Sequence, residues 1–175
     1  MWIKLCKQFF HMEENLYIAV AYVSPASSTY SSKRENIFEI LEQDLTALSS
    51  KGACLITGDF NARTANEPDY CTHDEGLRYL DLPVNMKHDT PLPRINSDKH
   101  ITDDHGKQLL QLCKTAGIRI LNGRSLGDTS GVSTCFSFNG SPSVIDYMVA
   151  SERLLASIET LHVHDPTPMS IHCVL

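Results

Sequence analysis

The sequence predicts an α/β protein built as one domain over residues 1–175. A chain of 175 residues, 42% of them hydrophobic, can bury one core of ordinary size. Two β-prone apolar runs, 16–23 and 53–57, flank a segment in which apolar residues have helical spacing. Strand, helix and strand in this order indicate a crossover connection between strands of one sheet.

The N-terminal third is expected to form two strands and a helix. Alternation at 3–5 predicts an opening strand, and the nearly continuous apolar run 16–23 is typical of a strand buried on both faces. The helix that follows is expected to be capped by Ser31 or Ser32 and to end at Gly52. Its helically spaced apolar residues are Ile37, Ile40, Leu41, Leu45 and Leu48.

The middle of the chain is expected to contain a long irregular segment, then a helix and a strand. Between 64 and 101 the prolines, acids and histidines show no periodicity, and loops of this length are usually functional or disordered. Asp103 or Asp104 then opens a second amphipathic helix, which Gly117 closes. The apolar run 118–121 predicts another strand.

The C-terminal third is expected to be β structure. The runs 134–138 and 144–149 are β-prone, and the Asn139-Gly140 dipeptide between them is a strong hairpin signal. A final strand is expected at 161–164.

Composition limits the partners and the compartment. A formal net charge of −6 gives no overall attraction to nucleic acid, although a local cluster with a metal ion can engage phosphates within an acidic protein. The N-terminus lacks a long apolar stretch and a signal-peptide cleavage site. We therefore expect an intracellular protein of the nucleus or cytoplasm that is neither secreted nor membrane-spanning.

The cysteines are scattered and contain no C-x-x-C pair. We interpret them as reduced core residues, in preference to a disulfide framework or a zinc site. They are Cys6, Cys54, Cys71, Cys113, Cys135 and Cys173.

The most informative segment for chemistry is the end of the strand near Thr57. It places an acid, Asp59, and an amide, Asn61, two residues apart at the carboxyl end of a buried strand, where open α/β sheets bind ligands. Asp59 can accept a proton or a hydrogen bond from water while Asn61 fixes its orientation. The alternative is an ordinary strand-to-loop turn in which both side chains bond their own backbone.

Other polar groups are interpreted as surface residues. His162 and His164 could share a strand face as metal ligands, and 73–75 is a His-Asp-Glu cluster, but neither spacing is completed by further ligands. Scattered cations could contact a DNA backbone, although a solvated face is the more common reason for them. These cations are Arg94, Lys99 and Lys107.

Segment 58–63, Gly-Asp-Phe-Asn-Ala-Arg, resembles the signature of the endonuclease/exonuclease/phosphatase (DNase-I-like) superfamily in the form carried by non-LTR (LINE-type) retrotransposons. Further segments resemble later motifs of that family in the same order. They are 21–25, 94–99, 105–113, 121–124, 134–136, 143–147 and 170–172.

This resemblance implies a four-layer α/β sandwich, with two facing β-sheets flanked by helices, and one that is incomplete at the N-terminus. It implies Mg²⁺-dependent hydrolysis of DNA phosphodiester bonds. DNA is the expected partner, and a reverse transcriptase on the same parent polyprotein is a further one.

The resemblance also implies roles for eight residues. Asp59 would activate the water, Asn61 would bind water and phosphate, and His172 would contact the scissile phosphate, with Asp146 fixing the tautomer of His172. The substrate-binding set would be Tyr22, Arg63, Thr134 and Ser143, in which Tyr22 bonds a phosphate oxygen and the Thr and Ser support the site wall. For Tyr22 and Asp146 a satisfied polar group in the core is the alternative.

Two departures from the family pattern weaken the expected activity. The family's initial Asn and its metal-binding Glu lie in N-terminal strands that this sequence lacks, and Ile171 stands where the family has Asp. Mg²⁺ prefers oxygen ligands, so no metal-ligand set is assigned and turnover is expected to be weak or absent. The alternatives are a non-catalytic retrotransposon relic or DNA-binding fragment, and a phosphomonoesterase of the same superfamily.

Overall fold

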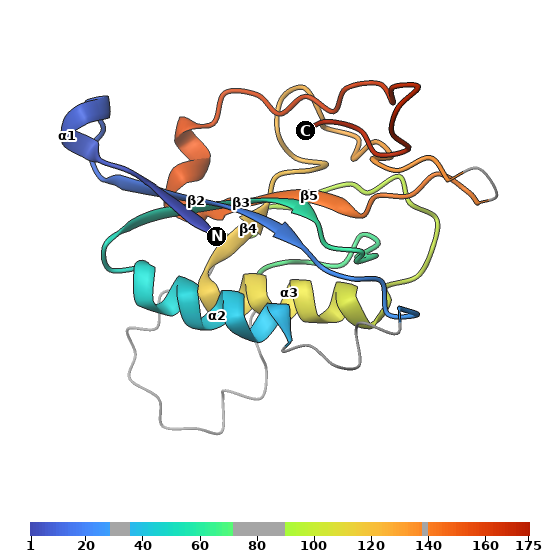
Figure 1. Ribbon diagram of the computed structural model, residues 1–175, viewed down its shortest axis with the longest axis horizontal. Coiled ribbons are helices and arrows are strands. Elements are labelled where there is room, and N and C mark those ends of the chain that lie inside the picture. Colours follow the sequence, from blue (N-terminus) through green and yellow to red (C-terminus); the bar gives the residue numbers. More distant parts are fainter. Residues whose placement is uncertain (29–35, 72–89, 138–139) are drawn as a thin grey trace.

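The computed structural model describes residues 1–28, 36–71, 90–137 and 140–175. Among them, five strands form one mixed sheet in the order β1-β2-β3-β5-β4 (Figure 1). The strands are β1 (Trp2–Leu5), β2 (Asn15–Tyr22), β3 (Gly52–Asp59), β4 (Ile118–Ile120) and β5 (Asp146–Ser151). The helices are α1 (Lys7–Phe10), α2 (Ile37–Leu48), α3 (Asp104–Ala116) and the 3-10 helix η3 (Glu152–Ser157).

The expected crossover is present. Strands β2 and β3 pair in parallel and α2 connects them, whereas β1–β2, β3–β5 and β4–β5 are antiparallel. Figure 1 shows α2 and α3 together on one face of the sheet, and η3 with the C-terminal segment on the other. The α/β class predicted from the sequence is therefore confirmed.

The main core lies between the sheet and the two long helices. Phe38 and Leu45 of α2 and Leu109 and Cys113 of α3 are buried against Ile56 of β3 and its neighbours. The helical spacing read from the sequence correctly includes the buried Leu41 and Leu45 of α2 but omits the buried Phe38, and Ile37 and Leu48 are only partly buried. A smaller core on the other face of the sheet is formed by Leu121, Ala150 and Leu161, with Leu154 and Leu155 packed against it.

Among the described residues, strand β2 is fully buried on one face and only partly covered on the other, so the prediction that it is buried on both faces is wrong. Tyr17, Ala19 and Ala21 face the helices and are buried. On the opposite face Val20 is 71% exposed and Tyr22 is 60% exposed. A continuous apolar run does not distinguish a half-covered strand from a fully buried one, because the covering layer comes from elsewhere in the chain.

The two long helices differ in how well their ends were predicted. Helix α3 has the expected cap, Asp103, whose side chain accepts from the amide of Gly106, and it ends at Gly117 with φ 63°. Helix α2 is capped by Asn36, not by Ser31 or Ser32, which lie outside the described residues.

Gly52 does not end helix α2 as predicted. The C-cap of the helix is Ser49, and Gly52 is the first residue of β3. A Cβ atom at Gly52 would overlap the carbonyl of Asn15 in β2. The glycine is therefore required by the close approach of two strands.

The C-terminal segments on the sheet face opposite α2 and α3 are joined to one another by isolated contacts. The predicted strands 134–138 and 161–164 are not strands where they are described, and Asn139 of the predicted hairpin lies outside the described residues. Single antiparallel bridges join Cys135 to Ser143 and to His172. The amides of Ile145, Asp146 and His172 donate to side-chain hydroxyls, so they do not extend a strand ladder here.

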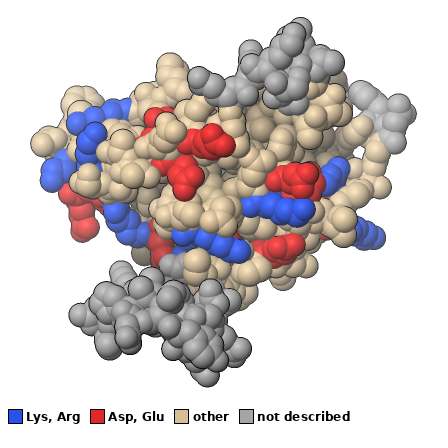
Figure 2. All heavy atoms as spheres, turned by 90° about the horizontal axis from the view of Figure 1, so that it is seen from below, with Lys and Arg blue, Asp and Glu red and all other residues tan. Residues whose placement is uncertain are grey.

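The helix-covered face carries charges of both signs. Figure 2 shows acidic and basic side chains interspersed over it, among the residues described. In the described part of the chain, no helix combines the length and apolar character needed to cross a bilayer.

Candidate active site

A row of three polar side chains crosses the sheet where β2 and β3 end and β5 begins. Asp59 is the register partner of Tyr22 in the parallel pair and of Asp146 in the antiparallel pair. Side chains in one row of a sheet point to the same face, and the exposure of Tyr22 marks this as the face opposite α2 and α3. Residues predicted from three separate motifs therefore lie side by side.

Asn61 holds the carboxylate of Asp59 by both oxygens. Its backbone amide donates to Oδ1 of Asp59 (2.8 Å), and its side-chain Nδ2 donates to Oδ2 (2.9 Å) and to the carbonyl of Val23 (2.8 Å). Asn61 has φ 44°, a left-handed conformation that asparagine tolerates better than most residues. The local turn and the orientation of Asp59 are thus achieved by the same bonds.

His172 is paired with Asp146. Its Nδ1 lies 3.0 Å from Oδ1 and 3.1 Å from Oδ2 of Asp146. Behind the pair, the hydroxyl of Thr134 accepts from the amides of Ile145 (3.1 Å) and Asp146 (3.0 Å). Thr134 is fully buried, so it supports the site wall from behind.

These contacts form one compact cluster. One ligand atom from each of Asp59, Asp146 and His172 lies within 4.8 Å of the other two. A fourth group, the buried thiol of Cys135, has its Sγ 3.9 Å from Nε2 of His172. No local pattern distinguishes Cys135 from the other cysteines, because its closeness to His172 arises only when the C-terminal segment folds back.

Burial and charge affect both carboxyl groups. Burial raises the pKa of Asp59; the amide of Asn61 lowers it, and the negative charge of Asp146 raises it further, with a net upward shift. Burial also raises the pKa of Asp146 above its usual range, against opposing hydrogen bonds from Thr134 and His172. Two acids that hold their protons more tightly than usual are candidates for proton transfer with a bound substrate.

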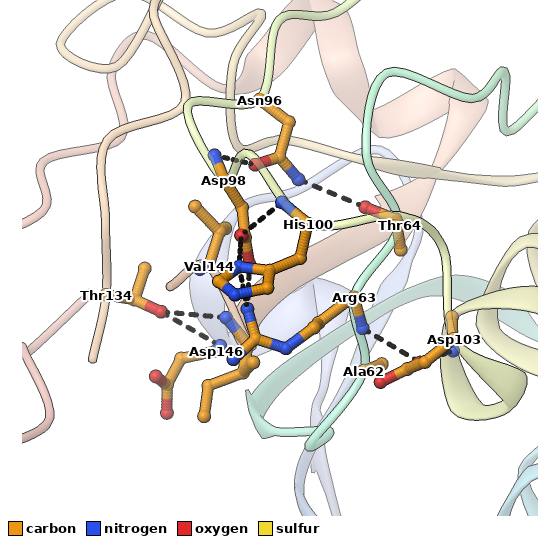
Figure 3. Close-up of polar contacts among 12 residues, drawn as sticks. Ala62, Arg63, Thr64, Asn96, Asp98, His100, Asp103, Thr134, Val144 and Asp146 are labelled. Carbon is orange, nitrogen blue, oxygen red and sulfur yellow. Dashed lines mark hydrogen bonds and ion pairs between the residues drawn. The ribbon is translucent and has the colours of Figure 1, made fainter. Parts of the chain in front are cut away.

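Arg63 lies in a second polar cluster (Figure 3). Its Nη1 is 2.6 Å from Oδ2 of the fully buried Asp98 side chain and 2.9 Å from Nδ1 of His100. Nδ1 of His100 is 2.6 Å from Oδ1 of Asp98. Sequence reasoning missed Asp98 and His100, although their Asp-x-His spacing within an aperiodic segment was a usable signal.

The pKa of Asp98 is lowered. Burial by itself would raise it, but the backbone and side-chain hydrogen bonds of His100 and the charge of Arg63 outweigh the burial. Asp98 is therefore ionised, and its carboxylate holds the partly exposed side chains of Arg63 and His100 in place.

A short stretch of backbone joins the two clusters. The amide of Val144 donates to Oδ2 of Asp98 (3.3 Å), and the next two amides donate to Thr134 (Figure 3). The start of β5 is thus held by Asp98 on one side and by Thr134 on the other, which fixes the position of Asp146.

The turn after β3 is anchored to the first turn of α3. The amide of Arg63 donates to Oδ1 of Asp103 (3.0 Å), and Nδ1 of His105 lies 3.0 Å from the carbonyl oxygen of Asn61. Helix α3, which packs in the main core, therefore sets the position of the turn that carries Asn61 and Arg63.

The remaining predicted residues occupy other places. Ser143 is buried and pairs with Cys135 through backbone bonds. Arg94 is also buried and donates to Thr64 (2.7 Å), so it does not face a DNA backbone. The exposed residues are Lys99, Lys107, His162 and His164, while segment 73–75 lies outside the described residues.

The cluster fits Mg²⁺ only in part. The carboxylates of Asp59 and Asp146 are the oxygen donors that Mg²⁺ prefers, whereas the third candidate ligand, His172, offers nitrogen. Ile171, next to this histidine, contributes its carbonyl to the amide of Phe136 and has no side-chain oxygen. The residues present supply a carboxylate pair without the further oxygen donor expected from the resemblance.

No protein-family model and no curated protein sequence matches this chain. Solved structures do. The endonuclease domain of TRAS1, a telomere-specific non-LTR retrotransposon, is 18% identical with a TM-score of 0.54, over 91% of this chain and 54% of that one. The 3′-5′ exonuclease NExo from Neisseria meningitidis is 15% identical with a TM-score of 0.55, over 91% and 59%.

The catalytic domain of APE2 from Xenopus laevis is 15% identical with a TM-score of 0.52, over 91% of this chain and 48% of that one. The chain thus spans about half the length of the structures it matches. These likenesses agree with the resemblance read from segment 58–63. The chain has the DNase-I-like fold of the endonuclease/exonuclease/phosphatase proteins.

Proposed function

We propose that the Asp59 cluster hydrolyses phosphodiester bonds of DNA with the help of a divalent ion, and that the chain is of retrotransposon origin. The observation that carries this proposal is the convergence of Asp59, Asn61, Asp146 and His172, from three separate segments, on one sheet face of a DNase-I-like fold. The likeness to a retrotransposon endonuclease domain supports both parts.

Hydrolysis needs a base for the water, a positive group near the phosphate and a fixed geometry. Asp59 is the base, because its raised pKa suits proton transfer and Asn61 fixes both of its oxygens. His172, oriented through Nδ1 by Asp146, presents the rest of its ring to a phosphate. Its side chain is 34% exposed, so a substrate can reach it.

A divalent ion would be held by Asp59 and Asp146, with His172 beside them. When bound, it would neutralise the negative charge that develops on the phosphate oxygens. Mg²⁺ is the ion that the resemblance implies. Because Ile171 offers no oxygen ligand, we expect weak Mg²⁺ binding and slow turnover.

The DNA backbone is proposed to cross the exposed row and the second cluster. Tyr22, at the open end of the row, is 60% exposed and can donate its hydroxyl to a phosphate oxygen. The side chains of Arg63 and His100 are 29% and 47% exposed, and His100 and Lys99 line a hollow of about 420 Å³. Thr134 and Ser143, being buried, act on substrate only through the site wall.

A nicking assay tests the proposal. Supercoiled plasmid is incubated with the protein and either Mg²⁺ or Mn²⁺, and nicking is compared with that by Asp59→Ala and by Glu42→Ala, an exposed acid of α2. We expect Asp59→Ala to lose about 100-fold or more and Glu42→Ala to retain activity. Equal nicking by wild type and Asp59→Ala contradicts the proposal.

Two other outcomes correspond to the alternatives. Binding of labelled DNA without cleavage would support a non-catalytic, DNA-binding relic. A structure of the Neisseria protein described as a 3′ phosphatase holds a product DNA hairpin, which favours a 3′-phosphorylated oligonucleotide as the second substrate to test. Phosphate release without nicking would assign a phosphomonoesterase.

The cellular setting belongs to the same proposal. A nuclease acting on DNA would work in the nucleus or cytoplasm. A reverse transcriptase from the same parent polyprotein is its natural partner, because cleaved DNA supplies the primer end that such an enzyme extends.

A further inference from the structure

Three hollows adjoin one another beside the candidate active site. Their volumes are about 440, 420 and 420 Å³, and each is large enough for a small organic ligand. The first and second share Phe136 and Pro166 in their linings, and the second and third share Ser97, Ser133 and Pro142. The three hollows therefore form one continuous groove, which we call the trough.

The end of the trough next to His172 is mainly apolar. Phe136 lines it together with residues 166–171, which directly precede His172 in the chain. Phe136 is 38% exposed and Met169 is 96% exposed. The backbone amide of Phe136 donates to the carbonyl oxygen of Ile171 (2.8 Å), which fixes the backbone that carries the ring. An exposed aromatic face with apolar neighbours suits the face of a planar ring such as a nucleobase.

The opposite end of the trough carries cationic side chains and hydroxyl groups. Lys99 and His100 both line it. Nδ1 of His100 lies 2.6 Å from Oδ1 of Asp98, whose side chain is fully buried, so a fixed carboxylate orients the imidazole (Figure 3). The protonated ring then presents its Nε2–H to an anion. Three hydroxyl groups that can donate to phosphate oxygens complete this end, on Ser97, Ser133 and Ser141.

The order of these groups fits one strand of nucleic acid better than a duplex. A strand offers planar bases and charged phosphates along one chain, which are the two kinds of group that the trough can bind. In a duplex the faces of the bases are covered by stacking, so only an unpaired strand can place a base on Phe136. The formal net charge of −6 gives no overall attraction to a duplex backbone, so the contacts must come from a local site.

We propose that the trough binds an unpaired stretch of a DNA strand, with a base on Phe136 and a phosphate at Lys99 and His100. This inference rests on the proposed function, because it assigns the path of the substrate strand away from the candidate active site past His172. Asp165 lines the middle hollow, where its negative charge opposes a phosphate. The preferred substrate is therefore DNA that is unpaired beside the scissile bond, not a continuous duplex.

The experiment measures fluorescence anisotropy of a labelled oligothymidine strand, alone and annealed to its complement, in EDTA so that no metal-dependent cleavage occurs. We expect the single strand to bind more tightly than the duplex. Phe136→Ala should weaken single-strand binding by about 5-fold or more, because a stacking contact is lost, and Phe136→Tyr, which keeps the aromatic face, should bind like wild type. Phe9→Ala removes another exposed ring, on α1, and is the matched control.

Salt dependence tests the phosphate end separately. Lys99→Ala should lower the slope of log affinity against log salt concentration by about 0.7, the value for one phosphate contact on a single strand. Lys107→Ala, which removes an exposed cation of α3 outside the trough, should leave the slope unchanged. Asp165→Asn should strengthen binding, because it removes the opposing charge.

Thermal unfolding establishes that each variant is folded. Equal affinity for the single strand and the duplex would overturn the proposal, as would wild-type binding by folded Phe136→Ala or an equal change of slope in Lys99→Ala and Lys107→Ala. Because no cleavage is measured, the outcome is separate from that of the nicking assay. Absent nicking together with the expected binding would contradict the proposed hydrolysis and leave the trough as a single-strand site.

Discussion

Asp59 and Asp146 are register partners in the antiparallel pair of β3 and β5, so two carboxyl groups occupy one row of the sheet. The pKa of each group is raised, mainly by burial, and the charge of Asp146 contributes to the shift of Asp59. Ionising both groups in the folded protein therefore costs free energy, and this cost lies at the candidate active site.

Replacing Asp146 with asparagine should lower the pKa of Asp59, because a neighbouring negative charge is removed while the bond to His172 can remain. Carbon-13 NMR of the Asp59 carboxyl group measures this directly. Glu42→Gln, on the helix-covered side of the sheet, is the control and should leave the Asp59 titration where it was.

The same variant should change the pH dependence of stability. A folded-state pKa above the unfolded value of 3.8 contributes stability that is fully present below 3.8 and is lost as the pH rises through the folded value. Asp146→Asn removes the pH-dependent loss of stability that comes from Asp146 and reduces the loss that comes from Asp59. Its unfolding free energy should therefore rise relative to wild type across that window, and a constant difference would contradict the assignment.

Ile171→Asp should increase Mg²⁺-dependent nicking. The change returns a carboxylate next to His172, where the resemblance expects one, and an additional oxygen donor strengthens Mg²⁺ binding. We expect an increase of about 10-fold or more at limiting Mg²⁺. Ile171→Asn, similar in size but uncharged, is the matched control, and equal activity of the two variants would show that the missing carboxylate does not limit the rate.

Gly58→Ala should strongly destabilise the protein. Gly58 has φ 144°, and a Cβ atom there would overlap the carbonyl of Ala21 in β2. Strain and overpacking together should cost about 3 kcal/mol or more in urea unfolding. Gly117 also has positive φ (63°) but open space around it, so Gly117→Ala should cost only about 1 kcal/mol.

Asp98→Asn should also destabilise the fold, by about 3 kcal/mol at neutral pH, because it breaks a buried pair and leaves Arg63 without its carboxylate. The pKa of Asp98 is lowered, so its contribution is present above 3.8 and is lost as the pH falls through the folded value. The difference from wild type should therefore shrink in acid. Asp104→Asn, which removes an exposed pair with Lys107, should leave the unfolding midpoint unchanged.

Local signals in the sequence determined much of this protein. The spacing of apolar residues predicted most of the buried faces of α2 and α3 but missed Phe38, and Asp103 and Gly117 marked both ends of α3. The Gly-Asp-Phe-Asn motif after β3 located Asp59 and Asn61 at the carboxyl end of a strand. These features depend on residues within a few positions of one another, so periodicity and capping rules can read them.

Tertiary structure alone decided which distant groups meet. That β2 is covered on one face, that Arg63 joins Asp98 and that the thiol of Cys135 faces His172 all depend on contacts between segments far apart in the chain. No local pattern encodes them, because they arise from how the C-terminal segment and the loop before α3 pack on the sheet. The sequence identified Asp59 and His172 as candidates, and the folded chain brought them together with Asp146 in one cluster.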